Sequence, residues 1–112
     1  MLKVTFEKEE REITLKIKGH AGQADIGHDI VCASCSILAY TVAQLIKNAD
    51  SIDDLQEPPV IKLDSGDAVI SCIPTNEAYC TILGIFMFAE VGYKLLAHNF
   101  PQFVELKPFG TD

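Results

Sequence analysis

The amino-acid sequence predicts an α+β fold: a single two-layer domain in which a mixed sheet of about four to five strands packs with two helices, in the chain order ββαββαβ. Three observations lead to this prediction. The chain has 112 residues, a length that suits one domain. Several short segments alternate apolar and polar residues, as half-buried strands do. Two longer apolar segments carry the spacing of helices instead.

Two strands open the chain. Residues 2–7 and 13–18 each place an apolar side chain at every second position. The charged residues 8–12 join them, which predicts a β-hairpin. Residues 19–29 follow with three glycines and no periodicity, and this stretch is therefore expected to be a loop.

A helix is predicted over residues 30–49. Its apolar residues fall on one stripe: Val31, Cys35, Leu38, Val42, Leu45 and Ala49. Asp29 stands in the N-cap position, where its carboxylate can accept hydrogen bonds from the free amides of the first turn. Two short strands, residues 60–63 and 68–73, then flank a polar turn at residues 64–67.

A second helix follows, with Thr75 or Asn76 as its N-cap and its end near Asn99. Val104 and Leu106 indicate a last strand. Periodicity predicts these elements, but it leaves open the order of the strands in the sheet.

The second helix contains a stretch, residues 78–97, that is apolar enough to raise the question of a membrane span. Glu90 and Lys94 lie one turn apart in it, a spacing that suits a helix with one edge in water. Charged groups at the middle of a membrane are costly. We therefore expect a core helix that also meets a second subunit, and no membrane association.

The charge balance limits the partners. Nine basic against sixteen acidic residues give a net charge of −7, which argues against a protein that tracks nucleic-acid phosphates and suits a basic partner. The N-terminal residues contain no apolar run of signal-peptide length, which predicts a cytoplasmic location with reduced cysteines. Cys72 and Cys80 are too far apart for a zinc-ligand pair, so neither a metal nor a cofactor is expected.

Residues 19–36 contain the side chains that are expected to take part in catalysis. A strand ends at His20, a glycine-containing loop follows, and Cys32 is expected in the first turn of a helix. Amides at a helix start favour a thiolate, and a nearby histidine can take the thiol proton and later give it to a leaving amine. This arrangement predicts a catalytic Cys–His pair. The alternative is that Cys32 is a small buried apolar residue and His20 a surface or capping residue.

Two further histidines compete for the role of base. His28 lies four residues before Cys32, in the loop or cap, whereas His20 ends a strand that fixes its position better. His98 lies near the C-terminal end of the second helix, where the helix dipole stabilises a cation, and is interpreted as structural.

The roles of Ser36 and Cys35 in this segment can each be interpreted in two ways. Ser36 lies one turn after Cys32, where its hydroxyl either acts near the site or bonds back to the Cys32 carbonyl. Cys32 and Cys35 also spell the C-x-x-C redox motif. The chain has no tryptophan, and no proline precedes Pro58, so the thioredoxin context of that motif is missing.

This segment resembles the pattern of the Prp-type bacterial ribosomal-processing cysteine proteases in three features: Gly19-His20-Ala21 at a strand end, the segment 27–33, and Ser36 four residues after Cys32. The resemblance covers this motif closely, and the length and element order of the chain more loosely. Cys35 is the one local departure. It adds a second thiol that oxidation can pair with Cys32.

The resemblance implies a cysteine endopeptidase that removes the N-terminal extension of a large-subunit ribosomal protein, the L27-type protein, by cleaving after an aromatic residue. It implies that Cys32 is the nucleophile and that His20 is the general base and acid. It also implies a homodimer and a mobile loop between the histidine and the cysteine. Two alternatives stay open: a non-catalytic ribosome-associated binding module, and a C-x-x-C thiol oxidoreductase.

The segment from Gly22 to Gly27 is predicted to be a substrate lid, because glycines at both ends can absorb large backbone changes. Ile26 is then expected to contact the aromatic side chain of the substrate. Asp29 and Ser36 are expected to support the site near the oxyanion. A merely flexible surface loop is the alternative for the lid.

Overall fold

The computed structural model describes residues 1–19 and 26–111, and in the second range it describes side chains from residue 30 onward. Five strands are present: β1 (Leu2–Glu9), β2 (Glu12–Lys18), β3 (Val60–Asp64), β4 (Asp67–Cys72) and β5 (Val104–Lys107). Two helices accompany them: α1 (Ile26–Ser51) and α2 (Tyr79–Asn99). The predicted chain order ββαββαβ is confirmed.

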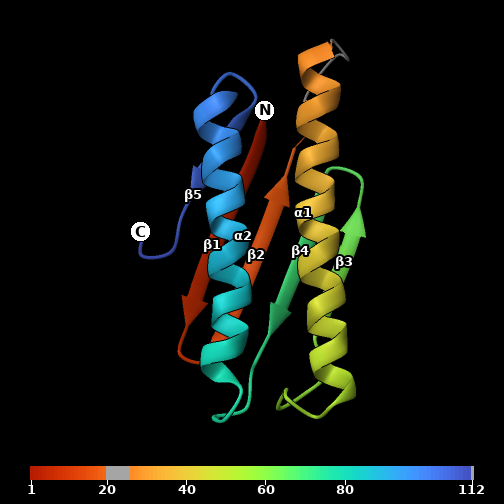
Figure 1. The fold of residues 1–112 in the computed structure, drawn as a ribbon, viewed down its shortest axis with the longest axis vertical. Helices are drawn as coiled ribbons and strands as arrows, with labels where there is room; N and C mark the ends of the chain where they lie inside the picture. Colours follow the sequence, from red (N-terminus) through yellow and green to blue (C-terminus); the bar gives the residue numbers. More distant parts are fainter. Residues whose placement is uncertain (20–25, 112) are drawn as a thin grey trace.

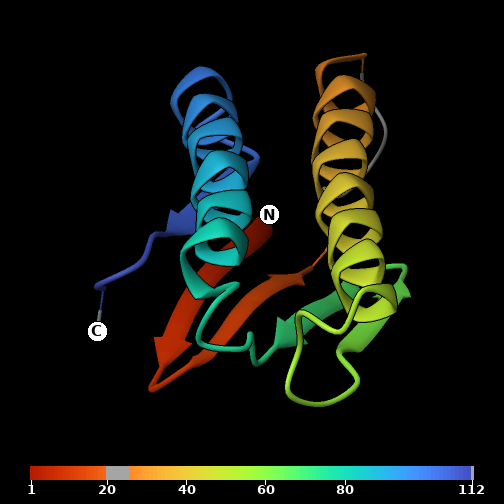
Figure 2. The same cartoon turned by 60° about the horizontal axis from the view of Figure 1, so that its bottom comes forward.

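The five strands form one sheet in the order β3-β4-β2-β1-β5. All neighbouring strands are antiparallel except β1 and β5, which pair in parallel. The two helices lie side by side and run in opposite directions (Figure 1). Figure 2 shows that both cover the same face of the sheet. The predicted two-layer α+β architecture with a mixed sheet is therefore confirmed.

The alternation predicted for the first hairpin decides which side chains enter the core. The apolar residues of β1 and β2 are buried beneath the helices: Leu2, Val4, Phe6, Ile13, Leu15 and Ile17. Phe6 packs at the centre of the core against Tyr93 of α2, with ring centroids 5.8 Å apart. An aromatic pair in this tilted geometry adds to the stabilisation from burial. The core thus lies between one sheet face and two helices.

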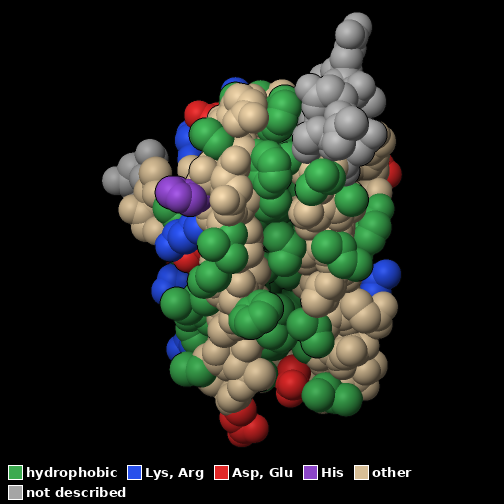
Figure 3. Space-filling view, turned by 45° about the horizontal axis from the view of Figure 1, so that its top comes forward, with side chains coloured by type: hydrophobic (Ala, Val, Ile, Leu, Met, Phe, Trp, Pro, Cys, Tyr) green, Lys and Arg blue, Asp and Glu red, His purple; other side chains and the backbone are tan. Residues whose placement is uncertain are grey.

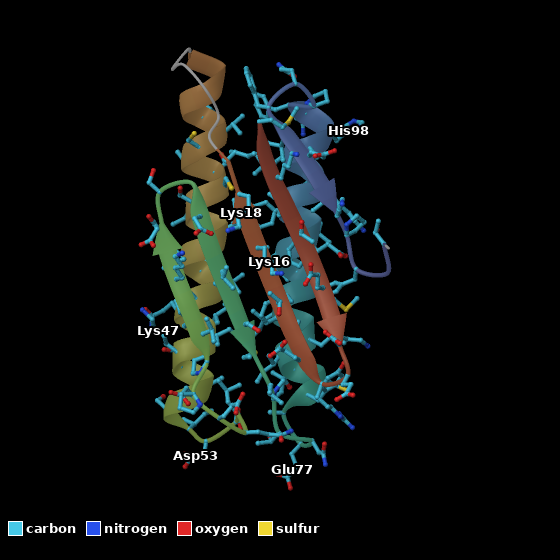
Figure 4. The ribbon with its side chains drawn as sticks, turned by 180° about the vertical axis from the view of Figure 1, so that it is seen from behind. Lys16, Lys18, Lys47, Asp53, Glu77 and His98 are labelled. Atoms are coloured by element: carbon cyan, nitrogen blue, oxygen red, sulfur yellow. The ribbon has the colours of Figure 1, made fainter. Side chains whose placement is uncertain are left out.

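The other sheet face is polar. Lys16 and Lys18 of β2 project from it (Figure 4), and the Lys16 ammonium lies 3.3 Å from the Glu7 carboxylate. Thr14 and Ser71 are hydrogen-bonded across β2 and β4, with their hydroxyl oxygens 2.9 Å apart. Charged and hydroxyl side chains on this face match an antiparallel sheet that is covered on one side only.

The start of α2 differs from the prediction. The helix begins at Tyr79, and neither Thr75 nor Asn76 is its N-cap. The Thr75 amide donates to the Asp54 carbonyl at 2.8 Å, so this residue pairs with the segment after α1 instead of opening a helix. The Thr75 hydroxyl accepts a hydrogen bond from the Ala78 amide at 3.3 Å, which closes a turn just before the helix.

Glu90 does not lie on a water-facing edge of α2 as expected. Its side chain is buried, with the Lys94 ammonium 3.5 Å from one carboxylate oxygen. The other oxygen accepts a hydrogen bond of 2.7 Å from the Phe109 amide. A buried carboxylate is costly unless it is paired in this way. Glu90 therefore fastens the chain after β5 to α2.

Both helices are long and apolar enough to cross a membrane by length and composition alone. Within each of the segments Ile30–Ser51 and Tyr79–Asn99, 33% of an 18-residue apolar stretch is buried inside the domain. The helices also pack closely on each other, since a Cβ added at Gly92 would lie 2.9 Å from the Leu38 methyl carbons. Core helices of soluble proteins meet the same length and composition criteria.

Candidate active site

Helix α1 positions Cys32, but it begins earlier than the sequence predicted. Its first residue is Ile26, so Asp29 lies inside the first turn and is not the N-cap. Cys32 falls in the second turn and its side chain is half-buried. The helix dipole acts mainly within the first turn, so it acts on Cys32 less than the predicted first-turn position would allow.

A cavity of about 310 Å³ adjoins Cys32. It lies between α1 and the turn that joins β3 to β4. Its lining residues come from three parts of the chain: Leu2, Ile17 and Gly19 of the first hairpin, Cys32, Cys35, Ser36, Ala39 and Tyr40 of α1, and residues 63–68 of the second hairpin. We call this cavity the Cys32 pocket. It places a thiol in contact with a space large enough for a substrate side chain.

The end of β2 is held at the rim of this pocket by Gly19. The Gly19 amide donates to the Gly66 carbonyl at 3.1 Å. Gly19 has a φ of +99°, and a Cβ added there would lie 2.4 Å from the Met1 carbonyl oxygen. Only glycine fits such a position. The described part of the first hairpin therefore ends, at Gly19, on a backbone that is fixed beside the pocket.

The pocket wall formed by residues 64–67 is anchored to the sheet by Asp67. Its carboxylate accepts hydrogen bonds from the ammonium groups of Lys18 on β2 and Lys62 on β3, the latter at 2.6 Å. These hydrogen bonds, from Lys18 first and then Lys62, lower the pKa of Asp67 to about 2. The carboxylate is consequently ionised throughout the neutral range, and the anchoring persists there.

The structure places the other predicted site residues as follows. Ser36 lies on α1 one turn after Cys32, is exposed, and lines the pocket. Ile26 and Gly27 belong to the first turn of α1, so Gly27 is helical in this structure, and the hinge expected there stays a prediction. His20 and Gly22 lie outside the described residues. The pairing of His20 with Cys32 and the role of Gly22 in a lid therefore stay predictions.

Cys32 differs from the other three cysteines. Burial raises the pKa of the Cys35 thiol to about 11 and that of Cys72 to about 12. Both are therefore protonated near neutral pH. Cys80 is exposed but belongs to the start of α2 and does not line the pocket. Among the four cysteines, only Cys32 both lines the pocket and has a side chain that is partly exposed to solvent. All four cysteines are free in the structure.

Cys35 belongs to the core of the protein. Its side chain is buried, and its carbonyl accepts a hydrogen bond of 2.9 Å from the Tyr93 hydroxyl on α2. This contact ties the two helices together close to the pocket. A buried and protonated Cys35 favours a structural role over that of a redox partner for Cys32.

Two parts of this site were not predicted from the sequence. The turn at residues 64–67 forms one wall, and Tyr40 lines the pocket two helical turns beyond Cys32. One signal for Tyr40 was available, because Cys32, Ser36 and Tyr40 are spaced by four and so share one helix face. Across the described ranges, no group of three or more histidine, cysteine or acidic side chains is arranged to hold a metal ion.

The chain is similar to a known protein family over most of its length. The family model described as "Cysteine protease Prp" matches residues 1–105. No curated protein matches the chain. SMU.848 from Streptococcus mutans, whose crystal structure is known, shares 25% sequence identity with this chain. The two structures superpose with a TM-score of 0.68, and the alignment covers 97% of this chain and 94% of that one.

Two structures of the essential ribosomal processing protease Prp from S. aureus also share this fold. The complex with a covalently linked product peptide is 24% identical with a TM-score of 0.70. The complex with a substrate peptide is 17% identical with a TM-score of 0.68. Both alignments cover 96% of this chain and 99% of the other. With the family model extending over nearly the whole chain, from the first strand to the last, this protein belongs to the Prp family of cysteine proteases.

Proposed function

We propose that this protein is an endopeptidase that removes the N-terminal extension of an L27-type large-subunit ribosomal protein, with Cys32 as nucleophile and His20 as general base and acid. The observation that carries the proposal is the Cys32 pocket, which brings the half-buried thiol of α1 and the end of β2 to one cavity. His20 directly follows Gly19 at that end. The Prp protease of S. aureus is described as a ribosomal processing protease.

In the proposed mechanism, the His20 imidazole takes the Cys32 thiol proton as the sulfur attacks the scissile carbonyl carbon. The carbonyl oxygen gains negative charge, and nearby hydrogen-bond donors stabilise it. The Ser36 hydroxyl and amides of the first turn of α1, around Asp29, are the donors nearest in the chain to Cys32. The imidazolium then protonates the leaving amine, and water hydrolyses the thioester to release the second product and restore the thiol.

The charge of the chain supports a ribosomal substrate. A net charge of −7 favours encounter with a basic protein, and ribosomal proteins are basic because they bind RNA phosphates. A cytoplasmic location is part of this proposal, since ribosomes assemble there. No cofactor and no direct contact with nucleic acid are needed for the proposed reaction.

The first test uses the L27-type protein of the same organism. Incubation with the enzyme should shorten it at its N-terminus, by cleavage after an aromatic residue, and intact-mass spectrometry reports the loss. A matched substrate in which that aromatic residue is alanine should be cleaved at least about tenfold more slowly. Binding without any loss of mass would contradict the proposal and favour a non-catalytic ribosome-associated module.

We also propose a homodimer. The helix surface that faces away from the sheet is apolar (Figure 3). Its exposed apolar residues are Ile30, Ile37 and Leu45 on α1 and Met87, Phe88, Val91 and Leu95 on α2. An apolar groove of about 320 Å³ runs between the helices. Contiguous exposed apolar surface of this kind marks interaction sites in soluble proteins.

Phe88 is the most exposed apolar side chain of this surface, at 80%, and it lines the groove. Phe88→Glu should therefore dissociate the dimer, because a carboxylate would have to be buried without a partner. Sedimentation should show the 12.3 kDa monomer for this variant at micromolar concentration. Ile52→Glu, which alters an exposed residue beyond the end of α1, should remain dimeric. A wild-type protein that sediments as the monomer would contradict the proposal.

A further inference from the structure

The Cys32 pocket extends well beyond the thiol. Cys32, Ser36 and Tyr40 all line it, and their spacing of four places them on one face of α1. Eight helical residues rise about 12 Å, so the pocket follows α1 for two turns past Cys32. Its length exceeds what a single side chain next to the cleaved bond requires.

The floor of the pocket is apolar. It is built from Leu2 and Ile17 of the first hairpin, Ala39 of α1, and Leu63 and Ala68 of the second hairpin. Leu2 and Ile17 are core residues that fix this floor. An apolar floor favours an apolar side chain of the bound segment, because burial removes its surface from water.

The rim of the pocket is polar. Ser36 stands on one side, and the turn at residues 64–67 stands on the other. Asp67 holds this turn against β2 and β3 through its hydrogen bonds with Lys18 and Lys62. Hydroxyl and carboxylate oxygens at the rim can accept hydrogen bonds from the backbone amides of an extended peptide.

Tyr40 forms the end of the pocket that is remote from Cys32. Its side chain is 53% exposed, although it is large and aromatic. An aromatic ring left half open at the end of an apolar groove offers a face or an edge to a second ring or to an aliphatic side chain. Tyrosine contributes this contact area at a low cost in conformational entropy.

We infer that the Cys32 pocket is an extended substrate groove, and that Tyr40 binds an apolar side chain three or four residues from the cleaved peptide bond. The distance follows from about 12 Å along α1 and a rise of about 3.3 Å per residue in an extended peptide. The inference rests on the proposed peptidase function of the same pocket. It makes Tyr40 a specificity-determining residue, remote from the bond that breaks.

The test is a set of peptides that span the cleavage site of the N-terminal extension, each with one residue replaced by alanine, at positions one to five on either side. For the wild-type enzyme, alanine at one apolar position, three or four residues from the cleaved bond, should lower kcat/KM about tenfold. For Tyr40→Ala the same replacement should lower it less than twofold, because the partner ring is gone.

Two further variants make the comparison specific. Tyr40→Phe should restore the preference, since it keeps the ring. Ile52→Ala removes an exposed apolar side chain beyond the end of α1 and should behave as the wild type. Each value is a ratio between two peptides on one enzyme sample, so a partly unfolded sample does not alter it. Equal losses for wild type and Tyr40→Ala at every position would overturn the inference, as would coupling only at the residue next to the cleaved bond.

A binding measurement separates this inference from the proposed function. The same peptides carry fluorescein, and anisotropy reports their affinity for Cys32→Ala and for Cys32→Ala with Tyr40→Ala. Peptides that bind with a preference dependent on Tyr40 but are not cleaved by the wild type would support the groove and contradict the proposed function. Cleavage without that dependence would keep the proposed function and overturn the groove. Peptides that neither bind nor react would overturn both.

Discussion

Cys32→Ala should abolish peptide cleavage, with a loss of about four orders of magnitude or more in kcat/KM, because the proposed reaction has no nucleophile without the sulfur. The fold should persist. The Cys32 side chain is half-buried at the wall of a cavity, so its truncation leaves the packed core intact. Kinetics on a peptide from the N-terminal extension and a thermal midpoint on the same samples check both statements.

Cys80→Ser is the matched control, since Cys80 is exposed and does not line the pocket. This variant should retain full activity. When the Cys80→Ser variant is treated with iodoacetamide near pH 7, Cys32 should be modified, and activity should be lost in proportion to that modification. Cys35 and Cys72 should stay unmodified, because burial raises their pKa values to about 11 and about 12. Activity of Cys32→Ala within about tenfold of the wild type would remove the nucleophile assignment.

His20→Ala should be nearly as damaging as the loss of Cys32, whereas His28→Ala should have a much smaller effect. His20 follows Gly19, whose backbone is fixed at the pocket by its hydrogen bond to Gly66 and by its contact with Met1. We expect a base that follows this fixed residue to keep its distance to the nucleophile. His28 stands in the first turn of α1, one turn before Cys32.

The measurement is kcat/KM as a function of pH for both histidine variants. The His20 variant should lose the wild-type pH dependence on the acidic side, because that limb reports the ionisation of the base. His98→Ala alters the last turn of α2, away from the residues that line the pocket, and should behave as the wild type. The reverse order of His20 and His28 would assign the role of base to His28.

The strands could be predicted because their signal is local. In β1 and β2 every second residue is apolar, and the same residues are buried against the helices. The start of α1 could not be predicted in this way. Gly27, His28 and Asp29 have low helix propensity, and the loop-like composition of residues 19–29 hid one additional turn of helix. Nevertheless, α1 begins at Ile26.

The pocket could be predicted only in part. Cys32 was found because a thiol and a histidine occur in a recognisable spacing in one segment. The wall at residues 64–67 lies about thirty positions further along the chain, and no local pattern signals that the two meet. Their proximity follows from the strand order, which places β4 next to β2 and which periodicity does not determine. Tyr40 was missed because an exposed aromatic residue gains meaning only once the cavity beside it is known.

The contact between Met1 and Gly19 matters for how the protein is handled in the laboratory. The first residues of β1 lie at the rim of the pocket, and Leu2 is part of its lining. An affinity tag joined to Met1 would begin at the substrate groove and compete there as a tethered peptide, at a high effective concentration. The chain after β5 is fastened to α2 through Glu90 at the other edge of the sheet (Figure 1). A tag placed at that end would leave the groove accessible.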